Sequence, residues 1–436
     1  MSLTEKHIAI LGVGRSGRAA AALALREGAR VSAWDTAGVE AFSEMPVGVE
    51  IHPNASEAEG RELVSDLLVV SPGIDTYGSY VAAFSAQTGE VIGEVELAAR
   101  YFEGRIVGIT GTNGKTTTTE LVERILSHAA LGGTACGNYG TPFAEVVLQS
   151  APPAVVSLEL SSFQLETIRT LHPVVAIWLN FAPDHMDRYP TVEAYRAAKL
   201  RIFENQTSAD IAVVRSGESL PKLAARQLTF STTDESADWY SNGHRILHAG
   251  ETWIDMDHDT ALRGLHNAEN LMAAFATCHA LGVPATLMRE ALHGYAPPPH
   301  RCELIRTLDG VEYLNDSKAT NLHALESALR SQTRPVVLIA GGKEKGLDYA
   351  SVIPLLVEKA LAVVTFGQIA RPLADLFSKV VACESVSNLA AAVATARSLA
   401  PHGSTILLSP GTSSFDQFTG YEQRGNAFRD LVHQLR

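Results

Sequence analysis

The sequence has few cysteines, no long apolar run and no excess of positive charge, and each absence argues against a class of protein. Its four cysteines, Cys136, Cys278, Cys302 and Cys383, lie far apart and form no Cys-x-x-Cys pair, which argues against a disulfide framework or a zinc site and fits reduced thiols in a cytoplasm. No run reaches the roughly 18 apolar residues of a membrane span. The N-terminus lacks the basic-then-apolar layout of a signal peptide. We therefore expect a cytoplasmic protein without membrane insertion.

The charge balance is acidic, with a formal net charge of −13. This balance argues against general nucleic-acid binding, and we expect no nucleic-acid partner. It does not exclude an anionic small molecule, because a few local amides and cations suffice to bind phosphate.

Apolar runs alternate with helical patterns along nearly all of the 436 residues, which predicts an α/β fold with parallel sheets. We expect three domains: a Rossmann-like N-terminal domain over 1–93, a central P-loop-type ATPase domain with a mostly parallel sheet over 94–298, and a Rossmann-like C-terminal domain over 299–436. The proline cluster in "YAPPPHRCE" marks the second boundary. The polar segment 216–253 is predicted to form peripheral strands and loops.

The first glycine-rich turn follows the strand-like run His7 to Leu11. Gly12, Gly14 and Gly17 have the G-x-G-x-x-G spacing, and Asp35 closes the next apolar run. Taken alone, this pattern is typical of a dinucleotide site whose acidic residue binds the ribose. A nicotinamide-dependent dehydrogenase is therefore one hypothesis, although no hydride-transfer site is evident further along the chain.

The second glycine-rich turn is the strongest local signal. In "GITGTNGKTTTTE", Gly111 and Gly114 let backbone amides approach phosphate oxygens, Lys115 would reach the β- and γ-phosphates, and Thr116 would bind Mg²⁺. The match to the P-loop pattern is imperfect, because Ile109 stands where the first glycine belongs. A glycine-rich strand-to-helix turn without phosphate is the alternative, and a regulatory NTPase is another.

Three further side chains are ambiguous on their own. Glu159 ends an apolar run and is either a Mg²⁺ ligand or a solvated strand end. His185 follows another apolar run and is either a ligand or a structural histidine. Lys199, on a helical stretch, has the pattern of an ordinary surface residue.

The last third of the chain places three polar loops after apolar runs. They are "NDSKATN", "GGKEKGLD" and "SPGTSSFDQFTGYEQRG". Each could bind a small anion beyond the carboxyl end of a parallel strand, or could be a plain turn and helix cap.

Taken together, these segments resemble the Mur ligases of peptidoglycan synthesis over essentially the whole chain. The motifs that carry the resemblance are "GITGTNGKTT", "LELSSFQLE", "DHMDRY", "YRAAKLRIFEN", "HNAENLMAA", "PHRCE", "NDSKATN", "GGKEKG" and "SPGTSSFDQF". Within the family, "NDSKATN" with "SFDQF" is similar to the member that adds D-glutamate.

The resemblance implies an ATP-dependent amide ligase that joins D-glutamate to UDP-N-acetylmuramoyl-L-alanine through an acyl phosphate, and we expect a monomer. It implies two Mg²⁺ ions, one held by Thr116 and Glu159 and the other by His185 and a carbamylated Lys199. Lys115, His185, Lys199 and Lys318 would be catalytic. The implied ATP contacts are Gly111, Thr112, Asn113, Gly114, Lys115, Thr116, Thr117, Asn267, Asn270, Arg301 and Asp316.

The same resemblance assigns the two other substrates. The implied contacts to the UDP-linked substrate are Gly14, Arg15, Ser16, Asp35, Thr36, Gly73 and Asn138. The implied D-glutamate contacts are Thr320, Lys345, Ser414 and Tyr421. The chain departs from the family at two positions: Ala37 stands where some relatives have Arg, and Tyr421 stands where relatives can have Phe.

Overall fold

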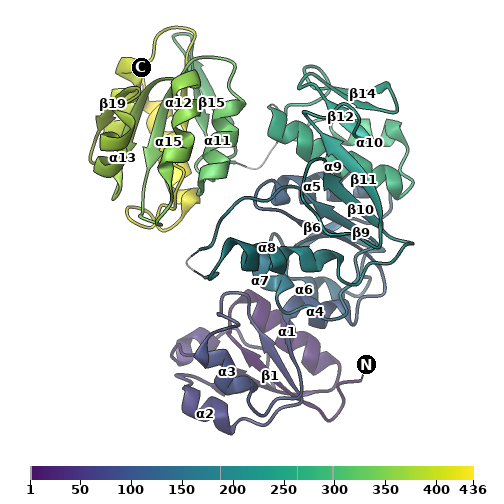
Figure 1. Cartoon of the computed structure of the whole chain (residues 1–436). Coiled ribbons are helices and arrows are strands. Elements are labelled where there is room, and N and C mark those ends of the chain that lie inside the picture. Colours follow the sequence, from purple (N-terminus) through teal and green to yellow (C-terminus); the bar gives the residue numbers. More distant parts are fainter. Residues whose placement is uncertain (1, 187, 263, 297–298) are drawn as a thin grey trace. The chain divides into compact units, whose positions relative to one another are not determined.

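The computed structural model describes residues 2–186, 188–262, 264–296 and 299–436 (Figure 1). It is an α/β protein with three sheets whose strands are mostly parallel, which confirms the predicted class. The chain forms two compact units, one of residues 1–255 and 269–293 and the other of residues 256–268 and 294–436. The first unit contains two of the three sheets, and the division into three domains stays a prediction. Pro297 and Pro298 of the expected linker lie outside the described residues.

The first sheet has the strand order β3-β2-β1-β4-β5, and all of its strand pairs are parallel. Alternate residues of β1 face opposite sides: Ile8 and Ile10 pack in one core with α1 and α4, whereas Ala9 and Leu11 pack in another with α3. The elements are β1 (His7–Leu11), α1 (Arg15–Arg26), β2 (Arg30–Trp34), β3 (Glu50–His52), α2 (Glu57–Glu62), β4 (Leu67–Val70), α3 (Ser79–Ser85), β5 (Val91–Gly93) and α4 (Glu94–Ala99).

The central sheet has the order β14-β13-β12-β11-β10-β9-β6-β8-β7. Its strands are parallel from β7 to β12 and antiparallel from β12 to β14, so the segment expected to be peripheral does form the edge of this sheet. The strands are β6 (Arg105–Thr110), β7 (Thr134–Gly137), β8 (Val155–Glu159), β9 (Val175–Trp178), β10 (Ile211–Arg215), β11 (Arg226–Ser231), β12 (Trp239–Ser241), β13 (Arg245–His248) and β14 (Glu251–Asp255). The helices are α5 (Lys115–His128), α6 (Phe143–Val147), α7 (Ser162–Leu165), α8 (Val192–Leu200), α9 (Leu265–Ala280) and α10 (Ala285–Ala291).

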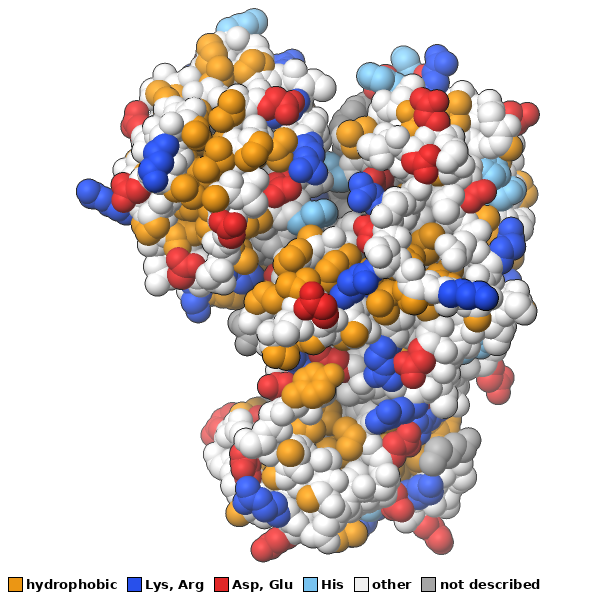
Figure 2. All heavy atoms as spheres, viewed as in Figure 1, with side chains coloured by type: hydrophobic (Ala, Val, Ile, Leu, Met, Phe, Trp, Pro, Cys, Tyr) orange, Lys and Arg blue, Asp and Glu red, His pale blue; other side chains and the backbone are white. Residues whose placement is uncertain are grey.

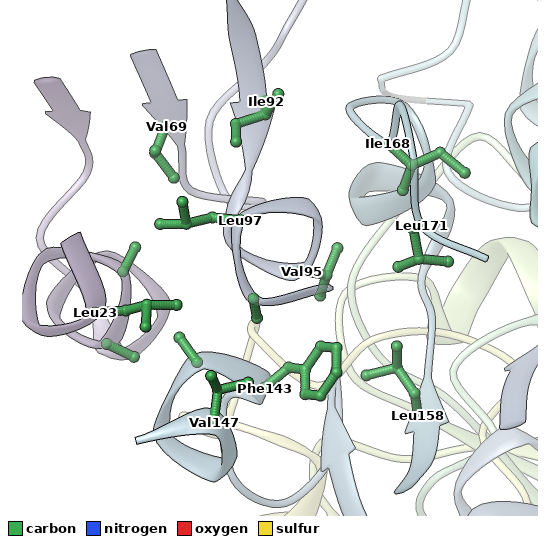
Figure 3. Packing of buried hydrophobic residues seen from close by; sticks show 14 of the residues in the cluster. Leu23, Val69, Ile92, Val95, Leu97, Phe143, Val147, Leu158, Ile168 and Leu171 are labelled. Carbon is green, nitrogen blue, oxygen red and sulfur yellow. The ribbon is translucent and has the colours of Figure 1, made fainter. Parts of the chain in front are cut away.

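One hydrophobic core runs from the first sheet into the central one (Figure 3). Leu97 of α4 and Phe143 of α6 both belong to this core. Two buried acidic side chains of α4 accept hydrogen bonds from the central part of the chain. Glu94 accepts the N–H of Ala144 at the start of α6, and Glu96 accepts N–H groups of residues 169–171. These contacts fix the first sheet to the central one within the same compact unit.

The third sheet has the order β15-β16-β20-β17-β18-β19, and only the β15/β16 pair is antiparallel. Apolar cores lie on its two faces, one with α14 and α15 and the other with α11, α12 and α13. The elements are β15 (Glu303–Leu308), β16 (Val311–Asn315), α11 (Leu322–Arg330), β17 (Val336–Gly341), α12 (Ile353–Lys359), β18 (Ala360–Phe366), α13 (Ala370–Phe377), β19 (Ala382–Ser385), α14 (Leu389–Leu399), β20 (Thr405–Leu408) and α15 (Tyr421–Gln434).

Acidic and basic side chains are interspersed on the face drawn in Figure 2, without a broad area of one sign. Among the described residues, no helix is both long enough and apolar enough to cross a bilayer.

Candidate functional site

Of the three glycines in the N-terminal turn, the backbone geometry requires Gly12 and Gly17 but not Gly14. Gly12 has φ +93, and a Cβ on Gly17 would lie 1.9 Å from the carbonyl oxygen of Gly12. Gly14 differs, because its φ is −67 and no described atom beyond its chain neighbours lies within 4 Å of where its Cβ would stand. Gly14 therefore borders open space, as close approach of a ligand to the backbone requires.

Helix α1 begins directly after Gly14, and no side chain caps its N-terminus. Its first N–H groups are thus available to an anion. Asp35 already accepts hydrogen bonds from the N–H groups of Val13 (3.0 Å) and Ala37 (2.9 Å), so this carboxylate organises the turn. Arg15 donates to the carbonyl oxygen of Gly140 at 3.3 Å. The other predicted contacts near this turn are half-buried or exposed: Ser16, Thr36 and Gly73.

The central glycine turn lies between β6 and α5, as predicted. Gly111 has φ +155 and Gly114 has φ +87, a conformation that L side chains rarely adopt. A Cβ on Gly114 would lie 2.3 Å from Oδ1 of Asn270. The amide of Asn180 clamps the turn, accepting the N–H of Asn113 at 2.9 Å and donating to its carbonyl oxygen at 3.1 Å.

Two lysine side chains meet at this turn. Lys115 donates to the carbonyl oxygens of Gly111 (2.9 Å) and Thr112 (3.0 Å), and Lys199 donates to the same Gly111 oxygen at 2.9 Å. Lys199 is 2% exposed. Burial, followed by the charge of Lys115, holds the pKa of the Lys199 amine well below its usual value. The surface pattern of the sequence at this position was therefore misleading, and Lys199 lies inside the site.

Glu159 ends β8 beside the central glycine turn, in register with Ile109, the next-to-last residue of β6. Its Oε1 accepts from the Nδ2 of Asn138 at 2.7 Å, which also joins a predicted substrate contact to this carboxylate. Its Oε2 is buried and has no hydrogen-bond partner among the described residues. A buried carboxylate oxygen without a protein partner fits a hard cation such as Mg²⁺.

His185 lies on the loop after β9 in the left-handed conformation, with φ +58. Its ring packs edge-on against Phe163, with centroids 4.9 Å apart. Within the described part of the chain there is no group of three or more His, Cys, Asp or Glu side chains placed to hold a metal. The predicted ligands include only two such residues, Glu159 and His185, and the other two are the Thr116 hydroxyl and a modified Lys199.

The remaining predicted ATP contacts of the central sheet are buried. Thr112 donates to the carbonyl oxygen of Ala182 at 3.0 Å, and Thr116 and Thr117 lie in the first turn of α5. On α9, Asn270 lies 3.4 Å from the hydroxyl of Thr118, and Asn267 is buried near the start of the helix.

The second compact unit gathers its predicted residues at the carboxyl ends of β16, β17 and β20. Asp316 follows β16. Its carboxylate accepts hydrogen bonds from the hydroxyl of Ser409 at 2.8 Å and from the N–H of Cys302 at 3.2 Å. Burial raises the pKa of Asp316 to about 7, and the nearby positive charge of Arg301 opposes that rise. The sequence separates Arg301 from Asp316 by the β15/β16 strand pair, and in the folded chain the charge of Arg301 acts on the Asp316 carboxyl.

Three of the predicted D-glutamate residues lie on these loops, and the fourth, Tyr421, begins α15 after the loop that follows β20. The ammonium of Lys345 lies 3.4 Å from the carbonyl oxygen of Thr320. The ammonium of Lys318 lies 3.9 Å above the ring of Tyr421. The hydroxyl of Ser414 is buried without a hydrogen-bond partner among the described residues. A buried hydroxyl of this kind fits a hydrogen bond to a ligand.

Arg424 and Tyr195 are structurally central residues that the sequence did not single out. Arg424 is fully buried on α15, donates to the carbonyl oxygens of Ser317 (2.8 Å) and Thr412 (3.2 Å), and so ties two of the three loops together. Tyr195 is buried with its hydroxyl 3.5 Å from that of Thr112 and its ring 4.9 Å from the Lys199 ammonium. An arginine or tyrosine on a helix has no sequence signature of its own that would mark it as part of a site.

Two family models match the chain: the Mur ligase middle domain over residues 109–278 and the Mur ligase glutamate ligase domain over residues 300–411. The UDP-N-acetylmuramoylalanine–D-glutamate ligase of Myxococcus xanthus is 39% identical over 455 residues, covering 100% of both chains. The enzyme of that name from Pelodictyon phaeoclathratiforme is 36% identical over 464 residues, covering 100% of this chain and 99% of its own. The chain therefore belongs to the Mur ligase family.

Solved structures show the same fold at lower identity. The UDP-N-acetylmuramate–alanine ligase MurC of Thermotoga maritima gives a TM-score of 0.60 at 18% identity, covering 98% of this chain and 99% of that one. A pseudomurein peptide ligase type C of Methanothermus fervidus gives 0.62 at 15% identity, covering 99% and 100%. The family membership does not support a nicotinamide-dependent dehydrogenase, so the G-x-G-x-x-G turn was an insufficient basis for that hypothesis.

Proposed function

We propose that this protein is an ATP-dependent ligase of peptidoglycan synthesis that adds D-glutamate to UDP-N-acetylmuramoyl-L-alanine. The observation that carries the proposal is the central glycine turn, where Lys115 and the buried Lys199 share the Gly111 carbonyl oxygen beside Glu159. The relatives with 35–39% identity, all named D-glutamate ligases, support the choice of amino acid. ATP and a nucleotide-linked precursor are cytoplasmic metabolites, so we propose that the reaction takes place there, catalysed by a monomer.

The chemistry begins with an unreactive carboxylate. The terminal carboxylate oxygen of the precursor attacks the γ-phosphorus of ATP, the bond to the ADP oxygen breaks, and an acyl phosphate forms. Two anions must meet in this step, and Lys115 on the glycine turn supplies positive charge where they do. The amine of D-glutamate then attacks the acyl carbon, loses a proton, and expels phosphate that retains the original carboxylate oxygen.

Mg²⁺ would add charge neutralisation at the transferring phosphoryl group, and Thr116, Glu159, His185 and Lys199 would hold it. We propose that Lys199 acts as a carbamate. Carbamylation requires a neutral amine that attacks CO₂ and gives up a proton, and burial of Lys199 favours that neutral form. The product is an anionic oxygen ligand, whereas an ammonium would repel the cation.

The roles of the other site residues follow the resemblance of their sequence motifs to the Mur ligases. We propose that Gly14, Arg15, Ser16, Asp35, Thr36, Gly73 and Asn138 bind the UDP-linked precursor, and that Asn267, Asn270, Arg301 and Asp316 bind ATP. Thr320, Lys345, Ser414 and Tyr421 would bind D-glutamate, and Lys318 would lie near the transferring phosphate. The parallel order β3-β2-β1-β4-β5 supports a Rossmann-like N-terminal domain. We retain a three-domain arrangement with a P-loop-type central domain and a Rossmann-like C-terminal domain as part of the proposal.

The test is product formation and the path of one oxygen atom. The protein is incubated with ATP, Mg²⁺, D-glutamate and precursor whose alanyl carboxylate carries heavy oxygen, and the products are weighed by mass spectrometry. We expect the D-glutamyl product and heavy oxygen in the released phosphate. Product without transfer of the label would contradict the acyl phosphate, and absence of the D-glutamyl product would contradict the activity.

A further inference from the structure

A half-buried arginine on the His185 loop joins two regions of the first compact unit. Arg188 donates from Nη1 to the carbonyl oxygen of Pro72 at 2.9 Å and from Nη2 to that of Ile74 at 3.0 Å. The same guanidinium pairs with Glu166 at 3.2 Å. Pro72 and Ile74 flank Gly73 on the loop after β4, so one side chain of the loop after β9 holds the backbone on both sides of a proposed UDP contact.

The carboxylate of Glu166, the partner of Arg188, also binds other side chains of the two loops. Glu166 is 2% exposed and follows α7, shortly after Glu159 and the end of β8. Besides Arg188, it accepts hydrogen bonds from the hydroxyls of Thr76 and Tyr189. Thr76 belongs to the loop after β4 and Tyr189 to the His185 loop. The Glu166 carboxylate thus binds side chains of both loops, whereas a simple salt bridge would bind only one.

The turn at His185 is closed by the two residues that bind Glu166. The His185 φ of +58 is costly for a residue with a side chain and persists only where its surroundings determine it. The carbonyl oxygen of His185 accepts the N–H groups of Arg188 and Tyr189, both at 3.0 Å. The Phe163 ring lies 3.9 Å from the Arg188 guanidinium and 4.9 Å from the His185 ring. The two residues that close the turn are therefore the two whose side chains bind Glu166.

We propose that Arg188 is a positioning residue. It holds the loop of residues 71–76 against the turn that the hydrogen bonds from Arg188 and Tyr189 to the His185 carbonyl oxygen close, so that the two segments move together. Ordering of the first loop by the UDP end of the precursor would then favour the His185 conformation needed at the reacting end. The inference rests on the proposed function for its substrates. It assigns Arg188 no contact with a reacting atom.

The test compares Arg188→Met and Arg188→Lys with the natural protein. A matched control is Arg61→Met, which removes an exposed i,i+4 pair with Glu57 on α2. For Arg188→Met we expect kcat to fall about 100-fold, because His185 is displaced. We expect the KM of the UDP-linked precursor to rise about tenfold and the KM of D-glutamate to stay unchanged. Lysine cannot bind two carbonyls and a carboxylate at once, so Arg188→Lys should recover only a part of kcat.

Binding of UDP alone, measured by calorimetry without turnover, provides an independent readout. Weaker UDP binding by Arg188→Met than by Arg61→Met supports the inference even if the natural protein proves not to ligate D-glutamate. Unchanged UDP affinity overturns it. If the natural protein is active and Arg188→Met lowers kcat with every KM unchanged, the residue only maintains the folded fraction, and the inference is wrong.

Discussion

The two glycine turns of the first compact unit have similar local structure and different surroundings. Both follow a parallel strand and precede a helix whose N-terminus lacks a side-chain cap. Around Gly14 there is open space and an Asp35 carboxylate engaged with the backbone. Around Gly111 there are two lysines and Glu159, whose second oxygen is buried without a described partner.

We infer from this difference that both glycine turns bind phosphate, and that the residues around each turn decide what happens to it. An uncapped helix N-terminus with open space suffices to hold a diphosphate. Phosphoryl transfer also needs charge at the migrating group in a site that excludes water. We infer that the first turn binds the UDP end of the precursor, and that the second turn catalyses the reaction at its other end.

The largest effect should come from removing the charge at the second turn. Lys115→Ala should lower ligase turnover about 10³-fold, because the developing charge on the γ-phosphate loses its cation. The melting temperature should hardly change, since the hydrogen bonds from the Lys115 ammonium to Gly111 and Thr112 join residues of the same turn. Phosphate release and a thermal melt check both points. The exposed Lys222→Ala is the control, and a Lys115→Ala variant with natural turnover would refute the role of the second turn.

Removing the buried lysine should lower turnover somewhat less, and an added carboxylic acid should partly restore it. Lys199→Ala should lower turnover about 10²-fold through loss of a metal ligand. Short carboxylic acids should restore part of the rate by occupying the place of the carbamate. Turnover measured with and without millimolar acetate or formate gives the answer. Full activity of Lys199→Ala without any added acid would exclude the carbamate.

The contact between α4 of the first sheet and α6 of the central sheet should be sensitive to pH. Burial raises the pKa of Glu94 to about 7, so its ionisation between roughly pH 4.5 and 7 disfavours the folded state, and stability is lost as pH rises through that window. Glu94→Gln keeps an acceptor for the Ala144 N–H and cannot ionise. At pH 8 its free energy of unfolding should exceed that of the natural protein by about 2 kcal/mol.

Denaturant unfolding at pH 4 and pH 8 measures this difference. Near pH 4 both proteins carry a neutral side chain at position 94 and should have similar stability. An equal difference at the two pH values would show that Glu94 is not the titrating group.

The smallest effect should come from the open glycine of the first turn. Gly14→Ala should leave the melting temperature unchanged, because its Cβ meets no described atom within 4 Å. It should raise the KM of the UDP-linked precursor about tenfold by obstructing the diphosphate. Gly17→Ala is the contrasting variant, since its Cβ would clash with the Gly12 carbonyl oxygen and should lower the melting temperature. An unchanged KM for Gly14→Ala would remove the first turn from substrate binding.

The sequence predicted the elements that carry local signals. The strand from His7 to Leu11 matches β1, and polar clusters do follow β6, β8, β9, β17 and β20. Periodicity and glycine placement suffice there, because both turns depend on residues close together in the chain. The strand order and the antiparallel edge of the central sheet depend on pairings between distant segments, which no local pattern encodes.

The site was harder to predict because burial is a tertiary property. Lys199 shares its carbonyl partner with Lys115 although 88 positions separate it from Gly111. On a helix, its sequence neighbours give the pattern of a surface lysine. Arg188 and Arg424 stand within the motifs "DHMDRY" and "SPGTSSFDQFTGYEQRG" but received no role, because their hydrogen bonds to backbone carbonyl oxygens form only in the folded chain. Only packing distinguishes such arginines from solvated ones.

The most direct test of the proposed function is the substrate dependence of phosphate release. With ATP and Mg²⁺, we predict rapid release only when UDP-N-acetylmuramoyl-L-alanine and D-glutamate are both present, and a much slower release when L-glutamate replaces D-glutamate. Release at the same rate without either substrate, or with L-glutamate, would contradict the claim that the precursor bound at the first turn is phosphorylated at the second.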